Sequence, residues 1–242
     1  MESEYLETSF QRAGIPLTEQ QAQQFLTYAH LLIEWNQKIN LTAITEFDEI
    51  VWKHFIDSCA LLLSKNVSRE TLGGKVIDVG TGAGFPGIPL KIMMPGMSLT
   101  LLDSLNKRID FLKEVGKQCG LEKVTYIHGR AEDIAQDPKF REQYQMSVSR
   151  AVAPLATLYE YNLPFLKRGG IFVAYKGDHY KEEVINSKKA VSVFGGEMIK
   201  EEPFILPGTE LQRCFVFAKK VQNTPKKYPR KAGTPSKKPI LG

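Results

Sequence analysis

A glycine-rich stretch at residues 75–90 constrains the fold more than any other part of the chain; it reads Lys-Val-Ile-Asp-Val-Gly-Thr-Gly-Ala-Gly-Phe-Pro-Gly-Ile-Pro-Leu. Residues 76–79 are apolar except for Asp78, which predicts a short buried strand. The glycines that follow allow a sharp turn and a close approach to a ligand, because glycine has no Cβ and tolerates positive φ. Pro86 suits the first turn of a helix. Strand, turn and helix together predict the start of a nucleotide-binding α/β domain.

The spacing of these glycines indicates which nucleotide binds. A G-x-G-x-x-G match begins at Gly82, but the first glycine after the strand is Gly80, which is the wrong register for a dinucleotide site. Asp78, Gly80, Gly82 and Gly84 instead form D-x-G-x-G-x-G. That arrangement resembles the first motif of class I S-adenosylmethionine-dependent methyltransferases. A nicotinamide or flavin site, and a turn that binds nothing, are the alternatives.

After residue 75, apolar strand patterns alternate with helical patterns, which predicts a parallel sheet with crossover helices. We expect seven strands, the last of them antiparallel after a hairpin at Pro207-Gly208. The predicted strands are 76–79, 98–102, 123–127, 145–149, 170–176, 198–205 and 211–218; the predicted helices are 105–118, 154–166 and 180–193. The fold class is therefore α/β, a Rossmann-like, seven-stranded, mostly parallel class I methyltransferase sheet with an N-terminal helical extension.

Residues 1–70 form the predicted helical extension, and residues 71–221 form the predicted methyltransferase domain. The extension contains a capping-box pattern at Thr18 and Gln21, and a second helix is expected over residues 47–64. His54 and Asp57 in that helix are three residues apart and share a face. We expect a structural hydrogen-bonded pair; an acid–base pair is the alternative.

Residues 222–242 form a predicted basic, flexible C-terminal tail. The net charge of the chain is +5, yet residues 219–242 hold eight Lys or Arg and no Asp or Glu, so the rest is slightly acidic. Such a tail is typical of nucleic-acid binding through phosphate neutralisation. We expect it to be mobile until bound, and its deletion to weaken RNA binding without changing cofactor affinity.

Several features that the sequence lacks exclude other classes of protein. No apolar run approaches the ~20 residues of a membrane span, and the acidic N-terminus lacks a signal core. The chain has only three cysteines, Cys59, Cys119 and Cys214, which are too far apart for a disulfide framework or a zinc site. We therefore expect a cytoplasmic protein with no membrane association and no metal.

Other candidate site residues follow the predicted strands. Asp103 ends the second strand, where a carboxylate can accept hydrogen bonds from ribose hydroxyls. Residues 129–133 follow the third strand and are placed to meet an adenine; a surface turn with a local ion pair at Arg130 is the alternative. Arg150 follows the fourth strand, beside the expected methyl-transfer centre; a capping or surface arginine is the alternative.

Stretches along nearly the whole chain resemble the bacterial small-subunit ribosomal RNA methyltransferase G family, also called glucose-inhibited division protein B. The matching stretches are residues 34–42, 54–58, 78–90, 102–108, 130–132, 149–151 and 224–231. The resemblance implies methyl transfer from S-adenosyl-L-methionine to N7 of one guanosine in 16S ribosomal RNA of the small ribosomal subunit. It also implies that Gly80, Phe85, Ala131, Glu132 and Arg150 contact the cofactor, to which the residue analysis adds Gly82 and Asp103. We expect a monomer.

This chemistry agrees with what the sequence lacks. Guanine N7 carries a free lone pair and no proton, so no general base is required, and we assign no catalytic residue. The enzyme must align N7 with the methyl group and exclude water. Arg130, Arg150, Lys176 and the tail are expected to hold the RNA backbone. A methyltransferase for a protein or small molecule, a non-catalytic RNA-binding protein and an oxidoreductase are the competing hypotheses.

Overall fold

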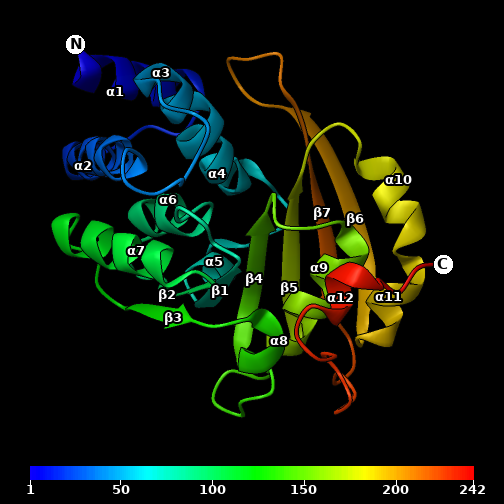
Figure 1. The fold of residues 1–242 in the computed structure, drawn as a ribbon. Coiled ribbons are helices and arrows are strands. Elements are labelled where there is room, and N and C mark those ends of the chain that lie inside the picture. The colour runs from blue at the N-terminus through cyan, green and yellow to red at the C-terminus, as the bar shows by residue number, and fades with distance from the viewer.

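A single twisted sheet runs through the molecule, which a computed structural model describes from Met1 to Gly242 (Figure 1). Its strands are β1 (Lys75–Val79), β2 (Ser98–Asp103), β3 (Val124–His128), β4 (Tyr144–Arg150), β5 (Leu166–Lys176), β6 (Gly196–Ile205) and β7 (Gln212–Lys220). The strand order is β3-β2-β1-β4-β5-β7-β6. The seven predicted strands are confirmed.

Six strands run in one direction, and one inserted strand, β7, runs antiparallel to them. β3, β2, β1, β4 and β5 pair in parallel, whereas β7 pairs antiparallel with both β5 and β6. The predicted hairpin between the last two strands is therefore present. β1 and β4 are neighbours although two strands separate them in sequence, so the strand order reverses there. Open α/β sheets bind ligands at the carboxyl ends of the strands at such a reversal.

Helices cover both faces of the sheet (Figure 1). One face carries α1 (Glu2–Arg12), α2 (Glu19–Asn36), α3 (Phe47–Ile50), α4 (Asp57–Cys59), α6 (Gly87–Met93) and α7 (Asn106–Gln118). The other carries α8 (Ala131–Ile134), α9 (Leu155–Asn162), α10 (Tyr180–Asn186), α11 (Lys188–Val193) and α12 (Thr234–Lys237), while α5 (Arg69–Leu72) leads into β1. Each face buries its own apolar cluster, so the sheet separates two cores.

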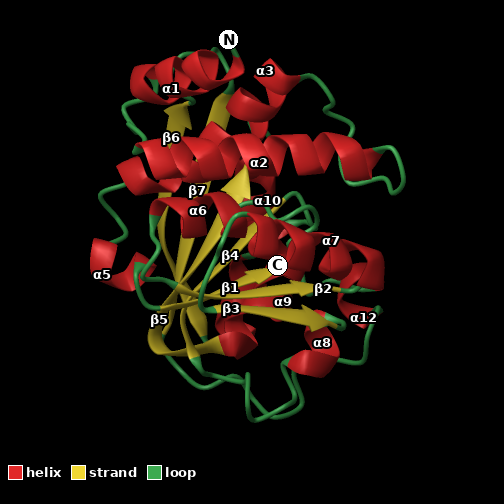
Figure 2. Ribbon diagram, turned by 90° about the vertical axis from the view of Figure 1, so that its left-hand side faces the viewer, coloured by secondary structure: helices red, strands yellow, loops and turns green.

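The N-terminal helices belong to the first of these cores. Figure 2 shows α2 lying across the face formed by α6 and α7. Its predicted capping box is confirmed, because Thr18 and Gln21 each accept a hydrogen bond from the other's backbone amide. Phe25 and Phe55 are fully buried in one cluster with Val76 of β1. The boundary between residues 70 and 71 stays a prediction, since this core crosses it.

The helix predicted over residues 47–64 is present but is not a regular α-helix. α3 continues into a π-helical segment, η1 (Val51–Ile56), then into α4 and a 3₁₀ turn, η2 (Ala60–Leu63). π-helical turns often occur at functional sites. The helix predicted over 180–193 is divided at Ser187 into α10 and α11, and Pro86 precedes α6 as its N-cap rather than opening its first turn.

The C-terminal segment, residues 222–242, packs against the body, and the prediction of a mobile tail is wrong. Arg230 binds the buried carboxylate of Glu160 with an Nη2–Oε2 distance of 2.6 Å. The Arg141 guanidinium donates to the Thr224 carbonyl over 2.8 Å, and the Gly233 amide donates to Glu132 over 2.8 Å. A basic composition could not reveal these internal partners, because they lie 70 or more residues away.

Candidate functional site

A cavity of about 460 Å³ opens at the carboxyl ends of β1, β2 and β4, where the strand order reverses. We call it the first cavity. All the cofactor-contact residues predicted from the sequence line it: Gly80, Gly82, Phe85, Asp103, Ala131, Glu132 and Arg150. The structure thus brings together residues from four separate stretches of the chain.

Two glycines of the turn after β1 have different structural reasons to be glycine. Gly80 has φ +73°, and a Cβ on it would approach Val152 Cγ2 to 2.8 Å. Gly82 has φ +60°, and a Cβ on it would meet nothing within 4 Å. Gly80 therefore permits the loop after β4 to pack closely, whereas Gly82 leaves backbone open toward the cavity.

Two aspartates hold this turn from opposite sides. Asp78 is fully buried and accepts hydrogen bonds from Thr81 Oγ1 and the Gly87 amide, each over 2.8 Å. Its burial raises the pKa of Asp78 to about 7. Asp103 Oδ2 accepts from the Gly82 amide over 2.9 Å while its carboxylate also faces the first cavity. Of the two, Asp103 is the one placed to touch a ligand.

The C-terminal segment completes the far wall of the first cavity. Glu132 is buried at the start of α8, and its Oε1 accepts the Gly233 amide. Tyr161 and Ser236 line the same cavity. Sequence analysis missed both residues: Tyr161 lies in α9, and no local pattern indicates that the C-terminal segment with Ser236 reaches the first cavity.

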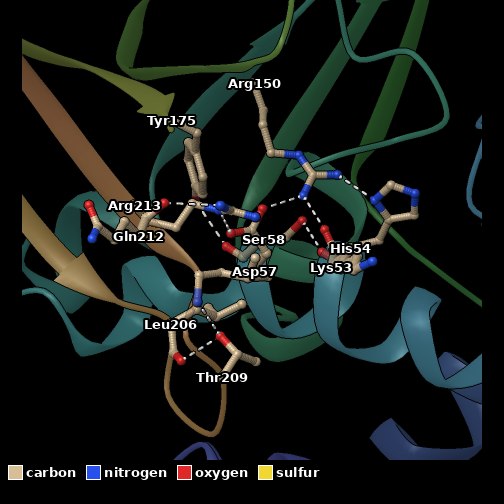
Figure 3. Close-up of polar contacts among 11 residues, drawn as sticks. Lys53, His54, Asp57, Ser58, Arg150, Tyr175, Leu206, Thr209, Gln212 and Arg213 are labelled. Carbon is tan, nitrogen blue, oxygen red and sulfur yellow. Dashed lines mark hydrogen bonds and ion pairs between the residues drawn. The ribbon is translucent and has the colours of Figure 1, made fainter. Parts of the chain in front are cut away.

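Arg150 lies between the sheet and the N-terminal helices (Figure 3). Its Nη1 donates to Asp57 Oδ2 over 2.7 Å and to the Lys53 carbonyl over 3.0 Å. Its guanidinium carbon is 4.9 Å from the centroid of the Phe85 ring. Arg150 is therefore neither a helix cap nor a surface residue, and it lines the first cavity.

His54 is the second partner of the Arg150 guanidinium. Arg150 Nη2 donates to His54 Nδ1 over 3.0 Å, so the proton of the neutral ring is on Nε2, which donates to Thr42 Oγ1 over 2.8 Å. Burial, followed by the Arg150 charge, lowers the pKa of His54 to about 3. His54 and Asp57 do not bond to each other as predicted; each instead binds Arg150, and together they position its guanidinium.

A second cavity, of about 560 Å³, lies on the other side of Arg150. It shares His54 and residues 150–153 with the first cavity. Asp57 at its edge also accepts Arg213 Nε over 2.7 Å, so one buried carboxylate holds two guanidinium groups (Figure 3). Arg213 and Glu183 line this cavity, and sequence analysis missed both. The Asp57–Arg213 contact spans 156 residues, so no local pattern indicates it.

Only some of the basic residues predicted to hold the RNA backbone are exposed enough to do so. The side chains of Arg150 and Lys176 are 12% and 10% exposed, and they form ion pairs with Asp57 and Glu183. These internal carboxylates exclude both cations from a phosphate-binding role. Arg130 is exposed at the edge of the first cavity. The exposed lysines at the C-terminal end are Lys219, Lys226, Lys227, Lys231, Lys237 and Lys238, whereas Lys220 is buried.

No group of three or more His, Cys, Asp or Glu side chains is placed to hold a metal ion. Cys59, Cys119 and Cys214 are free and buried. None of the helices combines the length and the apolar character that a membrane span requires.

The strand order, the antiparallel β7 and the glycine-rich turn at the β1–β4 reversal define a class I methyltransferase fold. The structure is similar to that of a mutant of MtNAS crystallised in complex with S-adenosylmethionine, with a TM-score of 0.56 and 14% identity, covering 80% of this chain and 73% of that one. That likeness shows the fold alone.

The sequence identifies the family more closely. The model of the family described as rRNA small subunit methyltransferase G matches residues 21–203. The chain is 51% identical to "Ribosomal RNA small subunit methyltransferase G" of Alkaliphilus metalliredigens, covering 97% of each chain. It is 47% identical to the protein of the same name from Lactococcus lactis subsp. cremoris, covering 93% of this chain and 94% of the other. The chain belongs to the rRNA small subunit methyltransferase G family, and it is an enzyme of the methyltransferase class.

Proposed function

We propose that the protein binds S-adenosylmethionine in the first cavity and transfers its methyl group to N7 of a guanosine in 16S ribosomal RNA of the small subunit. The observation that carries this proposal is the convergence of the predicted contact residues in one cavity at the sheet reversal, in a chain of this family. A cavity of about 460 Å³ is of the size that small-molecule ligands occupy.

The residues present fit the three parts of the donor molecule. The open backbone at Gly82, in the turn that begins at Gly80, suits the amino-acid part, and the buried Asp103 carboxylate suits ribose hydroxyls. Ala131 and Glu132, at the C-terminal end of β3, suit the adenine side. Phe85 and Arg150 line the part that borders the second cavity.

The donor supplies a methyl group already activated by a sulfonium. The N7 lone pair forms the new N–C bond while the bonding pair of the S–C bond leaves on sulfur, so no proton is removed and no base is needed. The protein's contribution is alignment and exclusion of water. The ion pairs of Arg150 hold the wall between the two cavities in place for that purpose.

Methyl transfer from labelled S-adenosylmethionine to small subunits from cells lacking this protein tests the reaction. We expect label only in the deficient subunits, at guanine N7; label in a protein or a small molecule would overturn the proposed substrate. Asp103→Ala tests the site, with an expected loss of roughly 5- to 150-fold in S-adenosylmethionine affinity by calorimetry. Asp110→Ala, which removes an exposed carboxylate from α7, is the matched control. Unchanged affinity in Asp103→Ala would refute its ribose-binding role.

We also propose that the enzyme acts as a monomer in the cytoplasm and meets RNA through the exposed lysines of its C-terminal end. The seven predicted cofactor-contact residues converge within a single protomer, which supports a site that needs no second copy. Light scattering across a concentration series tests the oligomeric state. RNA affinity at several salt concentrations tests the phosphate contacts.

A further inference from the structure

The second cavity has chemistry that the proposed cofactor site does not use. Tyr175 and Phe215 line it, with ring centroids 4.9 Å apart, and Phe204 packs against Phe215. The rings of Tyr175 and Phe215 are buried and give the cavity an apolar base, which suits a flat aromatic ligand. The Asp57 carboxylate at its edge is already shared between Arg150 and Arg213, so it is not free to bind a ligand.

Glu183 of α10 is the one carboxylate of this cavity with a free oxygen. Its Oε2 accepts Lys176 Nζ over 2.6 Å and the Leu155 amide over 2.7 Å. No donor of the protein binds Oε1, and the side chain is 32% exposed in a cavity-lining position. Lys176 and the backbone therefore orient the carboxylate while one oxygen remains to accept hydrogen bonds from a ligand.

The wall that separates the two cavities leads directly to this carboxylate. Residues 151–153 line both cavities, and the Leu155 amide bound by Glu183 follows two residues later. Ala151 has φ +56°, a conformation that non-glycine residues rarely adopt and that occurs often at functional sites. A flat ring in the second cavity would therefore lie next to the first.

We propose that the second cavity holds the acceptor guanine and that Glu183 Oε1 accepts hydrogen bonds from its N1–H and 2-amino groups. This inference rests on the proposed function. Among the RNA bases, guanine alone presents two adjacent donors on its Watson–Crick edge, and a carboxylate is the matching acceptor. N7 is on the opposite edge of the purine, so a guanine held by Glu183 directs N7 toward the first cavity.

The same contact favours the reaction electrostatically. Forming the N7–methyl bond moves the positive charge from sulfur to the guanine ring as the S–C bond breaks. The Glu183 carboxylate then faces a ring that is more positive in the transition state than in the ground state. Glu183 thus both selects guanine and stabilises the charge that develops on it.

Glu183→Gln tests the proposal, with Glu182→Gln as the matched control. Both residues are in the first turn of α10, but Glu182 is exposed and does not line the cavity. We expect Glu183→Gln to lower kcat/KM for methyl transfer roughly 10- to 100-fold, because the charged oxygen that accepts both donors of the base is lost. S-adenosylmethionine affinity should stay unchanged, and Glu182→Gln should behave as wild type. Wild-type kcat/KM in Glu183→Gln would overturn the proposal.

A substrate RNA with inosine at the target position separates base reading from a merely structural ion pair with Lys176. Inosine lacks the 2-amino group, so wild type should methylate the inosine RNA roughly 10-fold more slowly than the guanosine RNA. Glu183→Gln, which has already lost the acceptor, should methylate the two RNAs at nearly the same rate. Because the rates on the two RNAs are compared within one protein, partial unfolding of the variant affects both rates equally and cancels from their ratio. Equal inosine penalties in both proteins would overturn the role of Glu183. Absence of N7 methylation by wild type on the guanosine RNA would overturn the proposed function instead.

Discussion

The two cavities on either side of Arg150 are built in different ways. The first is formed largely by backbone at the ends of neighbouring strands, with the glycine-rich turn at its centre. The second is formed by side chains that come from η1, β5, α10 and β7. A cavity centred on a glycine-rich turn and the ends of neighbouring strands can be recognised from sequence, whereas a cavity held together by long-range ion pairs cannot.

Arg150 lines both cavities, so a change in its position alters the walls of both. Its partners Asp57 and His54 come from the N-terminal helices, and Arg213 joins from β7 through the same carboxylate. Removing one of these shared charges from the second cavity should therefore lower the free energy of unfolding. Substitutions in the first cavity should affect ligand binding, because an added side chain would occupy space that the backbone leaves open to the ligand.

The largest effect is expected at Asp57. Asp57→Ala leaves two guanidinium groups near the core without their shared carboxylate, and breaking such buried pairs costs about 3–5 kcal/mol. The free energy of unfolding from urea titration measures this loss. Glu122→Ala, an exposed acid without a hydrogen bond, is the control. A loss below ~1 kcal/mol would show that the second cavity does not depend on this network.

The next effect distinguishes two glycines of the first cavity. Gly80→Ala forces a positive φ and a clash with Val152, so the free energy of unfolding should fall by about 2–4 kcal/mol. Gly82→Ala should cost only about 1 kcal/mol, because its Cβ meets no protein atom. That Cβ points into open space, so Gly82→Ala should lower S-adenosylmethionine affinity in calorimetry more than its stability loss explains. Identical behaviour of the two variants would contradict the distinction.

The C-terminal segment tests whether the first cavity also depends on a distant contact. Arg230→Ala leaves the buried Glu160 carboxylate without its guanidinium, which should destabilise the packing of residues 222–242 by about 2–3 kcal/mol. Faster hydrogen exchange in that segment and roughly tenfold weaker S-adenosylmethionine binding are expected, since Ser236 lines the cavity. Lys231→Ala removes the same charge from an exposed position and should change neither.

This expectation replaces the prediction from sequence that loss of the tail would leave cofactor affinity unchanged. The segment now has two expected effects, one on the first cavity through its packing and one on RNA through its exposed lysines. Unchanged cofactor affinity in Arg230→Ala, together with faster exchange, would restore the earlier view.

The smallest effect near neutral pH is the pH dependence contributed by His54. The pKa of His54 is about 3 in the folded state and ~6.5 when unfolded, so between these values the unfolded chain binds one more proton. Stability therefore falls as pH falls below about 6.5, by up to about 1.4 kcal/mol per pH unit. Because other groups titrate in this range, urea titrations should compare wild type with His54→Gln. A variant with the same pH slope as wild type would show that burial beside Arg150 does not hold His54 neutral.

Much of the fold could be predicted because its signals are local. The apolar runs, the turn glycines and the capping residues Thr18 and Gln21 act within a few residues of one another. The π-helical segment η1 could not be predicted, because its widened turn is associated with contacts to Arg150 nearly 100 residues away. The same holds for the packed C-terminal segment, whose partners Glu132 and Glu160 are internal acids far from it in sequence.

The sequence by itself determined the class of fold, the family and the residues of the first cavity, because short-range backbone geometry and strand order bring them to one sheet edge. Only the tertiary structure decided which charged side chains are free to bind a ligand or RNA. It placed Arg150 and Lys176 in internal ion pairs, left Glu183 with a free oxygen, and fixed the basic segment against the body. The physical reason is that burial and pairing set what a charged group can do, and both depend on partners that the chain brings together only when folded.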